Sequence, residues 1–333
     1  MAFKVGTGGM SQRISRILGR AAVTILMVTI LNFILFRIIP GDPTTLLLSG
    51  ARDGVTTEQI QAQRERWGLD RPLVPDQLIR YLSTTARGDL GYSFKFQGEP
   101  VADLIIERLP ATIILVALGQ FIAIGSGVTL GIYAGWRRGS ALDHAVMATS
   151  LALYSTPPFW LAMILVVVFS TGLGLLPGYG AYSPSLASAT QFDWLADRVR
   201  HLVLPASTIA LVLIGQYVLV ARAAISDVMT EDYMITARAK GLTDWQMLVG
   251  HALRNAMLPV VTLITLNLGY VVAGAVTVEA VFGWPGIGSL TVEALGARDY
   301  PVLQGIFLLL GASIVAANLV ADLAYSLLDP RVR

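Results

Sequence analysis

Side chains that could carry chemistry are few and scattered in this sequence of 333 residues. The three histidines, His144, His201 and His251, each lie near the end of an apolar run, where a lone histidine usually caps a helix or reaches toward water. The sequence contains no HExxH zinc motif, no G-x-x-x-x-G-K-[ST] phosphate loop and no G-x-S-x-G nucleophile elbow. It also contains no cysteine. We therefore expect no catalytic residue, no metal site and no cofactor in this chain.

The composition indicates an integral membrane protein. Hydrophobic residues make up 54% of the chain, charged residues 14%, and the mean hydropathy is +0.64. A soluble domain usually carries about 25% charged residues. The net charge of +2 is small and the basic residues are dispersed, so we expect no nucleic-acid partner.

The apolar runs predict an all-α membrane protein with six transmembrane helices. A short tail, residues 1–20, precedes a first span at residues 21–38, and the other spans are predicted at about residues 112–136, 146–171, 205–221, 259–278 and 302–323. The third span is interrupted by Pro157 and Pro158. Pro205 is expected at the first helical position of span four, and Pro259 at the start of span five.

Two further sequence features concern the packing of span two and its connection to span one. Gly127, Gly131 and Gly135 form a repeated GxxxG, which predicts close helix packing, either within the chain or between subunits. A polar insertion of residues 39–110 separates spans one and two. Within it, Thr56 and Gln59 form a capping box, and residues 75–86 predict a short helix.

Polar residues inside the predicted spans could hydrogen-bond between helices or line a path. They are Asn32, Gln120, Gln216, Asn267 and Asn318. We expect Gln216, Asn267 and Asn318 as candidate path residues. The acids Glu279 and Asp322 lie near span ends, whereas a proton- or sodium-coupled carrier usually needs a central acid or a broken helix. This weakens the case for a stand-alone carrier or channel but leaves it open.

Residues 232–259 are the longest polar interruption in the second half of the chain. The pattern predicts two short helices with a break at Gly241, where a left-handed residue ends the first helix. Thr243 and Gln246 then form a capping box for the second helix. One apolar stripe is predicted on that helix, formed by Trp245, Leu248, Val249, Ala252 and Leu253. A docking element and a helix pair lying on lipid headgroups both fit this pattern.

Basic residues predict the orientation. The N-terminal tail, the turn at Arg137 and Arg138, the stretch at 232–259 and the C-terminus carry most of the lysines and arginines outside the long insertion. The positive-inside rule then places both termini and the stretch at 232–259 in the cytoplasm. The insertion, residues 39–110, is expected on the extracytoplasmic side.

Short motifs along nearly the whole chain resemble one transporter family. They are FILFRIIPGDP (33–43), WGLDRPL (67–73), RGDLGYS (87–93), RLPAT (108–112), LPGYG (176–180), HLVLPA (201–206), DYMITARAKG (232–241), HALRNAMLPVV (251–261), VEAVFGWPGIG (278–288), RDYPVLQG (298–305) and LLDPRVR (327–333). In this order and spacing they resemble the permease subunits of bacterial ABC importers of the dipeptide, oligopeptide and nickel group. The resemblance implies a type I importer permease in the bacterial cytoplasmic (inner) membrane. Its permease core would be residues 111–328, followed by a short tail at 329–333.

The resemblance also implies a role for the cytoplasmic loop, residues 226–258. In this family the loop carries a coupling helix that sits in a groove of an ATPase subunit. The matching positions are Thr236, Ala237, Arg238, Ala239, Lys240, Gly241, Leu242, Trp245 and Leu248. The sequence departs from the general motif at Ile235, where a glutamate is usual, and at Lys240, where an aspartate is common.

Partners and substrate follow from the resemblance alone. It implies a second and different permease subunit, two ABC ATPases that hold ATP and Mg²⁺, an extracytoplasmic substrate-binding protein and membrane lipid. Peptide is the expected substrate, because most of the family transports peptides. Nickel, glutathione and oligosaccharides stay open as alternatives, since specificity in such importers lies largely in the binding protein.

Overall fold

The computed structural model describes residues 9–38, 72–96, 98–183, 190–269 and 276–328. The chain forms two compact units, one of Met1–Pro110 with Leu290–Arg333 and one of Ala111–Ser289. The described residues are almost entirely helical, apart from a single β-bridge between Tyr92 and Pro100. This confirms the predicted all-α class.

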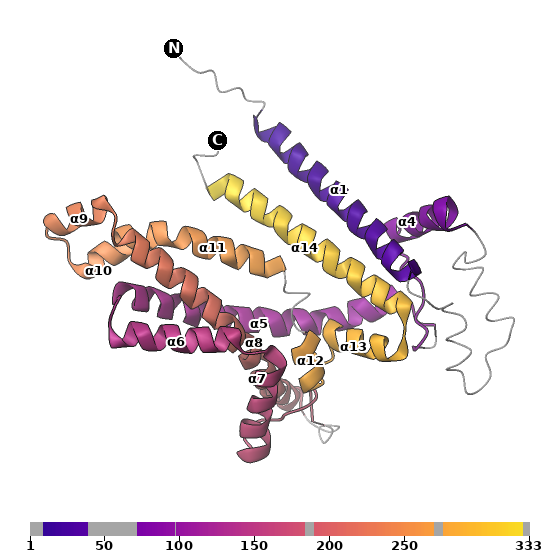
Figure 1. Ribbon diagram of the computed structural model, residues 1–333. Helices are drawn as coiled ribbons and strands as arrows, with labels where there is room; N and C mark the ends of the chain where they lie inside the picture. Colours follow the sequence, from indigo (N-terminus) through magenta and orange to yellow (C-terminus); the bar gives the residue numbers. More distant parts are fainter. Residues whose placement is uncertain (1–8, 39–71, 97, 184–189, 270–275, 329–333) are drawn as a thin grey trace, which may run out of the picture. The chain divides into compact units, whose positions relative to one another are not determined.

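The first unit is built on two long helices, α1 (Gly9–Ile38) and α14 (Tyr300–Leu328), which run side by side (Figure 1). Both are apolar enough to cross a membrane. They approach closely at Gly311, where an added Cβ would overlap Val28. Asn32 of α1 donates to the backbone oxygen of Gln304 over 2.9 Å, so a polar bond crosses the pair.

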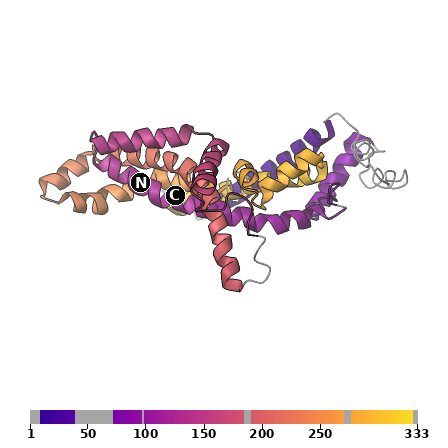
Figure 2. The same ribbon diagram turned by 90° about the horizontal axis from the view of Figure 1, so that it is seen from below.

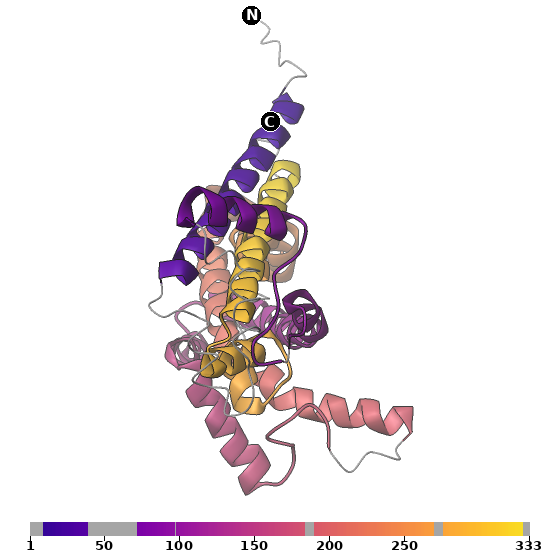
Figure 3. The same ribbon diagram turned by 90° about the vertical axis from the view of Figure 1, so that its right-hand side faces the viewer.

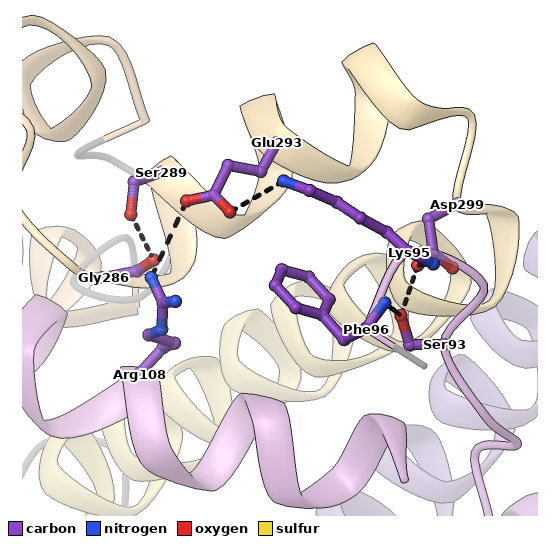
Figure 4. Close-up of polar contacts among 8 residues, drawn as sticks. All are labelled: Ser93, Lys95, Phe96, Arg108, Gly286, Ser289, Glu293 and Asp299. Atoms are coloured by element: carbon purple, nitrogen blue, oxygen red, sulfur yellow. Dashed lines mark hydrogen bonds and ion pairs between the residues drawn. The ribbon is translucent and has the colours of Figure 1, made fainter. Parts of the chain in front are cut away.

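The described end of the insertion packs within the same unit. A π-helical turn, η1 (Leu73–Gln77), leads into α4 (Leu78–Ala86), which confirms the helix expected at residues 75–86. Further along, the fully buried Asp299 accepts a hydrogen bond from the Ser93 hydroxyl (Figure 4). Its carboxylate also accepts the backbone N–H groups of Phe94 and Lys95. The capping box expected at Thr56 lies outside the described residues.

A surface ion pair joins the insertion to α13 (Ile287–Ala297) in this unit. The Lys95 ammonium lies 3.0 Å from Glu293, and the Arg108 guanidinium lies 3.8 Å from the same carboxylate (Figure 4). All three side chains are partly exposed to solvent, so these contacts contribute little stability.

The second unit contains the remaining helices. They are α5 from residue 111 onward (Val101–Trp136 in full), α6 (Ala141–Ser155), α7 (Pro158–Leu165) with the π-helical turn η2 (Val166–Gly172), α8 (Gln191–Val228), α9 (Asp232–Ala239), α10 (Asp244–Met247) with the π-helical turn η4 (Leu248–Ala252), α11 (Leu253–Gly269) and α12 (Val276–Phe282). Trp284 is fully buried in its core and donates from Nε1 to the oxygen of Ala111 over 3.0 Å.

The repeated GxxxG of α5 faces α8, which confirms packing within the chain. A Cβ added at Gly131 would lie 2.6 Å from the backbone oxygen of Val218, and one at Gly135 would lie 2.8 Å from the oxygen of Arg222. A Cβ added at Gly127 would lie 2.8 Å from Tyr217 Cβ and 3.0 Å from the backbone oxygen of Ile214. Small residues let these two helix backbones approach almost to contact.

Five described helices are long and apolar enough to span a membrane, and the broken pair of α6 with α7–η2 adds a sixth if it forms one span. The pair bends by 104° at the predicted break, because Pro158 opens α7 as its first residue. The first turns of α8 project from the second unit, and Phe192 there is 78% exposed (Figure 3).

The expectations for Pro205 and Pro259 were wrong. α8 begins at Gln191 and α11 at Leu253, so both prolines lie inside helices rather than at their first positions. Proline is tolerated inside membrane helices because neighbouring groups satisfy the freed carbonyls.

Candidate functional site

A helical hairpin of α9 and α10 stands at one end of the second unit, beyond the ends of α8 and α11 (Figure 2). We call residues 232–247 the coupling hairpin, after the role that the family resemblance predicts for this loop. Its two helices are short, so the geometry of the turn and the packing of its inner face decide its shape.

The turn is a Schellman motif. Gly241 has φ of +77° and donates its N–H to Arg238 O over 3.0 Å, while Leu242 donates to Ala237 O over 3.4 Å. Space around Gly241 is open, so backbone conformation and not crowding requires glycine there. This confirms the predicted break.

The second helix begins with the predicted capping box. Thr243 N–H donates to the Gln246 side-chain oxygen over 2.9 Å, and Gln246 N–H donates to the Thr243 hydroxyl over 3.4 Å. Together the Schellman turn and the box satisfy the helix-end groups on both sides of Leu242, so the hairpin has one preferred turn geometry.

The inner face of the hairpin is packed onto the membrane helices. Its buried cluster consists of Ala224, Ile225, Met234, Ala237, Met247, Leu248, Ala252 and Ala256. The cluster joins α8, α9, α10 and the start of α11. Asn255 of α11 also donates to the Tyr233 hydroxyl of α9 over 2.8 Å. The hairpin is therefore fixed to α8 and α11 by both apolar and polar contacts.

The predicted apolar stripe is divided, which corrects the expectation of a single face. The π-helical turn η4 shifts the register, so Leu248 and Ala252 are buried in the cluster whereas Trp245 and Val249 stay exposed. The buried half of the stripe is explained by the fold of this chain. Only the exposed half is free to contact a partner.

The nine residues that the sequence predicts for coupling also divide into a buried group and an exposed group. Ala237 and Leu248 are buried and Leu242 is half-buried, so these three support the hairpin. The exposed members are Thr236, Arg238, Ala239, Lys240, Gly241 and Trp245. Ile235 is 64% exposed and Trp245 is 71% exposed, and they are large apolar side chains on an outward surface. In the sequence, Ile235 stood out only because the family motif usually has a glutamate at that position.

The candidate path residues divide between the two units, with Gln216 and Asn267 in the second and Asn318 in the first. Asn267 of α11 donates to the Tyr217 hydroxyl over 3.0 Å, that hydroxyl donates to Gln120 Oε1 over 2.8 Å, and Gln120 Nε2 donates to the oxygen of Asn267 over 3.2 Å. This closed cycle links α5, α8 and α11. Gln216 has a buried Nε2 without a hydrogen-bond partner in the described structure. Asn318 is exposed and belongs to the other unit.

Glu279 has a structural role that sequence reasoning missed. The sequence places it near a span end, and in the structure it lies in the short helix α12 and is fully buried. Its carboxylate accepts from the Thr112 hydroxyl over 2.6 Å and from the N–H groups of Gly288 and Ser289 over 2.7 and 3.2 Å. A carboxylate at these amides stabilises the first turn of α13. The sequence did contain one signal for this role, because Glu279 lies beside a glycine-rich loop and a carboxylate there can cap a helix.

Among the described residues, no group of three His, Cys, Asp or Glu side chains could hold a metal ion. His144 and His201 each place Nδ1 near a backbone oxygen four residues earlier, at 2.8 and 2.9 Å. Both contacts are local helix contacts.

Comparisons with known proteins identify the family. Residues 127–333 match the family described as binding-protein-dependent transport system inner membrane component, and residues 10–116 match its N-terminal family. This chain belongs to that family. It is a permease subunit of an ABC importer, as its motifs suggested.

The relatives cover almost the whole chain. A putative peptide permease protein of Brucella suis is 40% identical over 312 residues, which are 93% of this chain and 95% of that protein. The di/tripeptide permease DppB of Pseudomonas aeruginosa is 38% identical over 335 residues, covering 96% and 98%. The dipeptide permease DppB of Escherichia coli is 37% identical over 340 residues, covering 97% and 99%.

Proposed function

We propose that this chain forms half of the translocation path of a peptide importer and receives the energy of ATP hydrolysis through the coupling hairpin. Two ABC ATPases would hold ATP and Mg²⁺, a second and different permease would complete the path, and an extracytoplasmic binding protein would deliver the peptide. Both termini and the hairpin would face the cytoplasm, with residues 39–110 outside.

One observation carries the coupling role. The hairpin has a buried face fixed to α8 and α11 and an outward face with exposed Ile235 and Trp245. Large apolar side chains held outward on a rigid turn suit a partner groove, because aromatic anchors contribute much of the binding energy at interfaces. Lipid headgroups alone would not require the Schellman turn to be fixed so firmly to both membrane helices.

The proposed mechanism depends on the unbroken helical connection between the hairpin and α11. α10 passes through η4 into α11 without a loop, so a force on Trp245 acts directly on a membrane helix. ATPase closure around ATP would move the hairpin, and the hairpin would move α8 and α11. The closed ATPases can shift the equilibrium between the outward-open and the inward-open permease only by the difference between their binding free energies for the two states.

Within the membrane, the Gln120–Tyr217–Asn267 cycle and Gln216 are the proposed polar part of the path. The Nε2 of Gln216 is buried without a hydrogen-bond partner in the described structure, so a movement of α8 that exposes it would offer a donor to a peptide carbonyl. Asn318 is the proposed contribution of α14. Peptide is favoured as the substrate because several relatives carry peptide or dipeptide in their names.

The test is affinity purification of the tagged chain from native membranes in mild detergent, with mass spectrometry of the bound proteins. A second permease and ATPases with phosphate-binding loops would support the proposal. A binding protein recovered with them can then be tested for peptide, nickel, glutathione and oligosaccharide ligands. Recovery of this chain alone, with transport activity in ATP-free liposomes, would overturn the proposal in favour of a stand-alone carrier.

A further inference from the structure

Arg222 and Asp143 form a two-point ion pair close to the base of the coupling hairpin. Arg222 Nε lies 3.0 Å from Asp143 Oδ1, and its terminal nitrogen lies 2.8 Å from Oδ2. Arg222 belongs to the last turns of α8, and Asp143 to the first turn of α6. A paired guanidinium and carboxylate fix orientation as well as distance, because the two hydrogen bonds are parallel.

The carboxylate is held from a second direction. Asp143 is only 2% exposed and also accepts the N–H of Gly139 over 2.9 Å. Ser140 caps α6 by accepting the N–H of Asp143 over 3.1 Å. The turn between α5 and α6 and the start of α6 therefore present this carboxylate to α8 in one position.

Other close contacts hold α8 on two sides. On the α5 side, a Cβ at Gly131 would lie 3.1 Å from the Arg222 nitrogen, and one at Gly135 would lie 2.8 Å from its oxygen. On the α6 side, a Cβ at Gly215 would overlap the oxygen of Ser150. α8 is thus packed between α5 and α6, and Arg222 adds a polar contact to α6 near the end of α8.

The hairpin depends on this part of α8. Ala224 and Ile225 lie two and three residues after Arg222 and belong to the buried cluster that includes Met234 and Ala237 of α9. If the last turns of α8 tilted away from α6, the cluster would tilt with them. A movement of the hairpin would then tilt the end of α8 alone and would not be transmitted to α6.

We propose that Arg222 and Asp143 are positioning residues for energy coupling. Their ion pair holds the end of α8 to α6, so that a displacement of the hairpin moves α5, α6 and α8 together. The inference rests on the coupling role proposed for the hairpin and assigns to this pair the stiffness of the connection. Neither residue needs to touch an ATPase or the substrate.

The experiment uses the intact complex and a pair of spin labels. The chain has no cysteine, so Asp232→Cys on the hairpin and Leu151→Cys on α6 give two specific label sites, both exposed. Electron-spin distance distributions are measured without nucleotide and after trapping with ATP, Mg²⁺ and vanadate. With Arg222 and Asp143 intact, we expect a narrow distribution whose mean is unchanged by trapping.

Asp143→Asn and Arg222→Lys are the test variants, and Arg138→Gln is the matched control. Arg138 is an exposed cation in the same turn whose removal leaves the pair intact. Each test variant should broaden the distribution at least twofold while co-purifying ATPase is retained, and the control should match the parent. If both variants keep the parent's narrow distribution in both states, the positioning role is wrong.

Two further results separate this inference from the coupling role. Loss of ATPase from a hairpin variant such as Trp245→Ala, with the label distribution still narrow, supports docking without involving Arg222. Retention of ATPase by every hairpin variant would contradict the docking itself. A test variant that fails to accumulate is replaced by the exchanged pair Asp143→Arg with Arg222→Asp, which should restore a narrow distribution.

Discussion

The Thr112 hydroxyl donates to the carboxylate of Glu279 over 2.6 Å, and the same hydroxyl accepts the N–H of Ile287 over 2.8 Å. One threonine on α5 therefore holds both α12 and the loop that follows it. Because Glu279 also accepts two backbone N–H groups, the loop at residues 282–288 closes over a carboxylate whose hydrogen-bonding groups are satisfied. A Cβ at Gly286 would overlap this carboxylate, so the loop needs glycine there.

Replacing Glu279 with glutamine should destabilise the protein. The amide oxygen can keep the N–H groups of Gly288 and Ser289, but the NH₂ then faces the Thr112 hydroxyl, whose hydrogen loses its acceptor. A buried unsatisfied donor costs about 1–3 kcal/mol. We expect a lower unfolding temperature of the detergent-solubilised chain and a lower yield. Glu293→Gln is the control, because its partly exposed ion pairs contribute about 0–1 kcal/mol. Equal stability of the two variants would contradict the capping role.

The close packing of α5 against α8 predicts that the same substitution has different effects at two positions on α5. Gly131→Ala should cost about 1–3 kcal/mol, because the added Cβ would lie 2.6 Å from a backbone oxygen and the helices must separate. Gly125→Ala on the same helix meets open space and should be neutral or slightly stabilising. Thermal unfolding in detergent measures both. Similar losses at the two positions would mean that the helices are not packed through this seam.

The polar cycle can be tested by removing one atom. Tyr217→Phe leaves Gln120 Oε1 and Asn267 Nδ2 without their shared partner, and hydrogen bonds between membrane helices contribute about 0.6–2 kcal/mol. We expect this loss in unfolding free energy, measured by denaturant titration. Tyr154→Phe on α6 is the control, because Tyr154 is exposed. An unchanged unfolding free energy for Tyr217→Phe would show that the cycle does not join the three helices.

The turn of the coupling hairpin predicts a specific defect. Gly241→Val places a β-branched residue at φ of +77°, where it is strained although space around it is open. The membrane helices should assemble normally while transport-coupled ATP hydrolysis is lost. Gly250→Ala, in open space at an ordinary φ, should keep both. Near-normal uptake by well-expressed Gly241→Val protein would count against the account.

Local signals in the sequence were sufficient for the hairpin. The break at Gly241 and the box at Thr243 depend on residues within three positions of each other, and both were predicted correctly. The buried half of the stripe was not predictable, because the π-helical turn at Leu248–Ala252 changes the helical period. Periodicity assumes 3.6 residues per turn and cannot detect such a change.

Expectations failed where distant residues decide the structure. Pro205 was placed at a helix start by its own preference, yet α8 begins with a capping box at Thr190 and passes through the proline. Glu279 has its partner Thr112 far away in the sequence, so its burial could not be inferred from its neighbours. The path residues share this limit, because Asn267 meets Tyr217 only after α8 and α11 have packed together.

Contact between Trp245 and an ATPase is the most direct test of the central claim. In this cysteine-free chain, Trp245→Cys can carry a single photocrosslinker, and Phe192→Cys, equally exposed at the start of α8, is the control. After illumination of the purified complex, the account predicts a crosslinked product of this chain with an ATPase subunit from position 245 and none from position 192. Retained ATPase that crosslinks from neither position, or from both alike, would contradict the account.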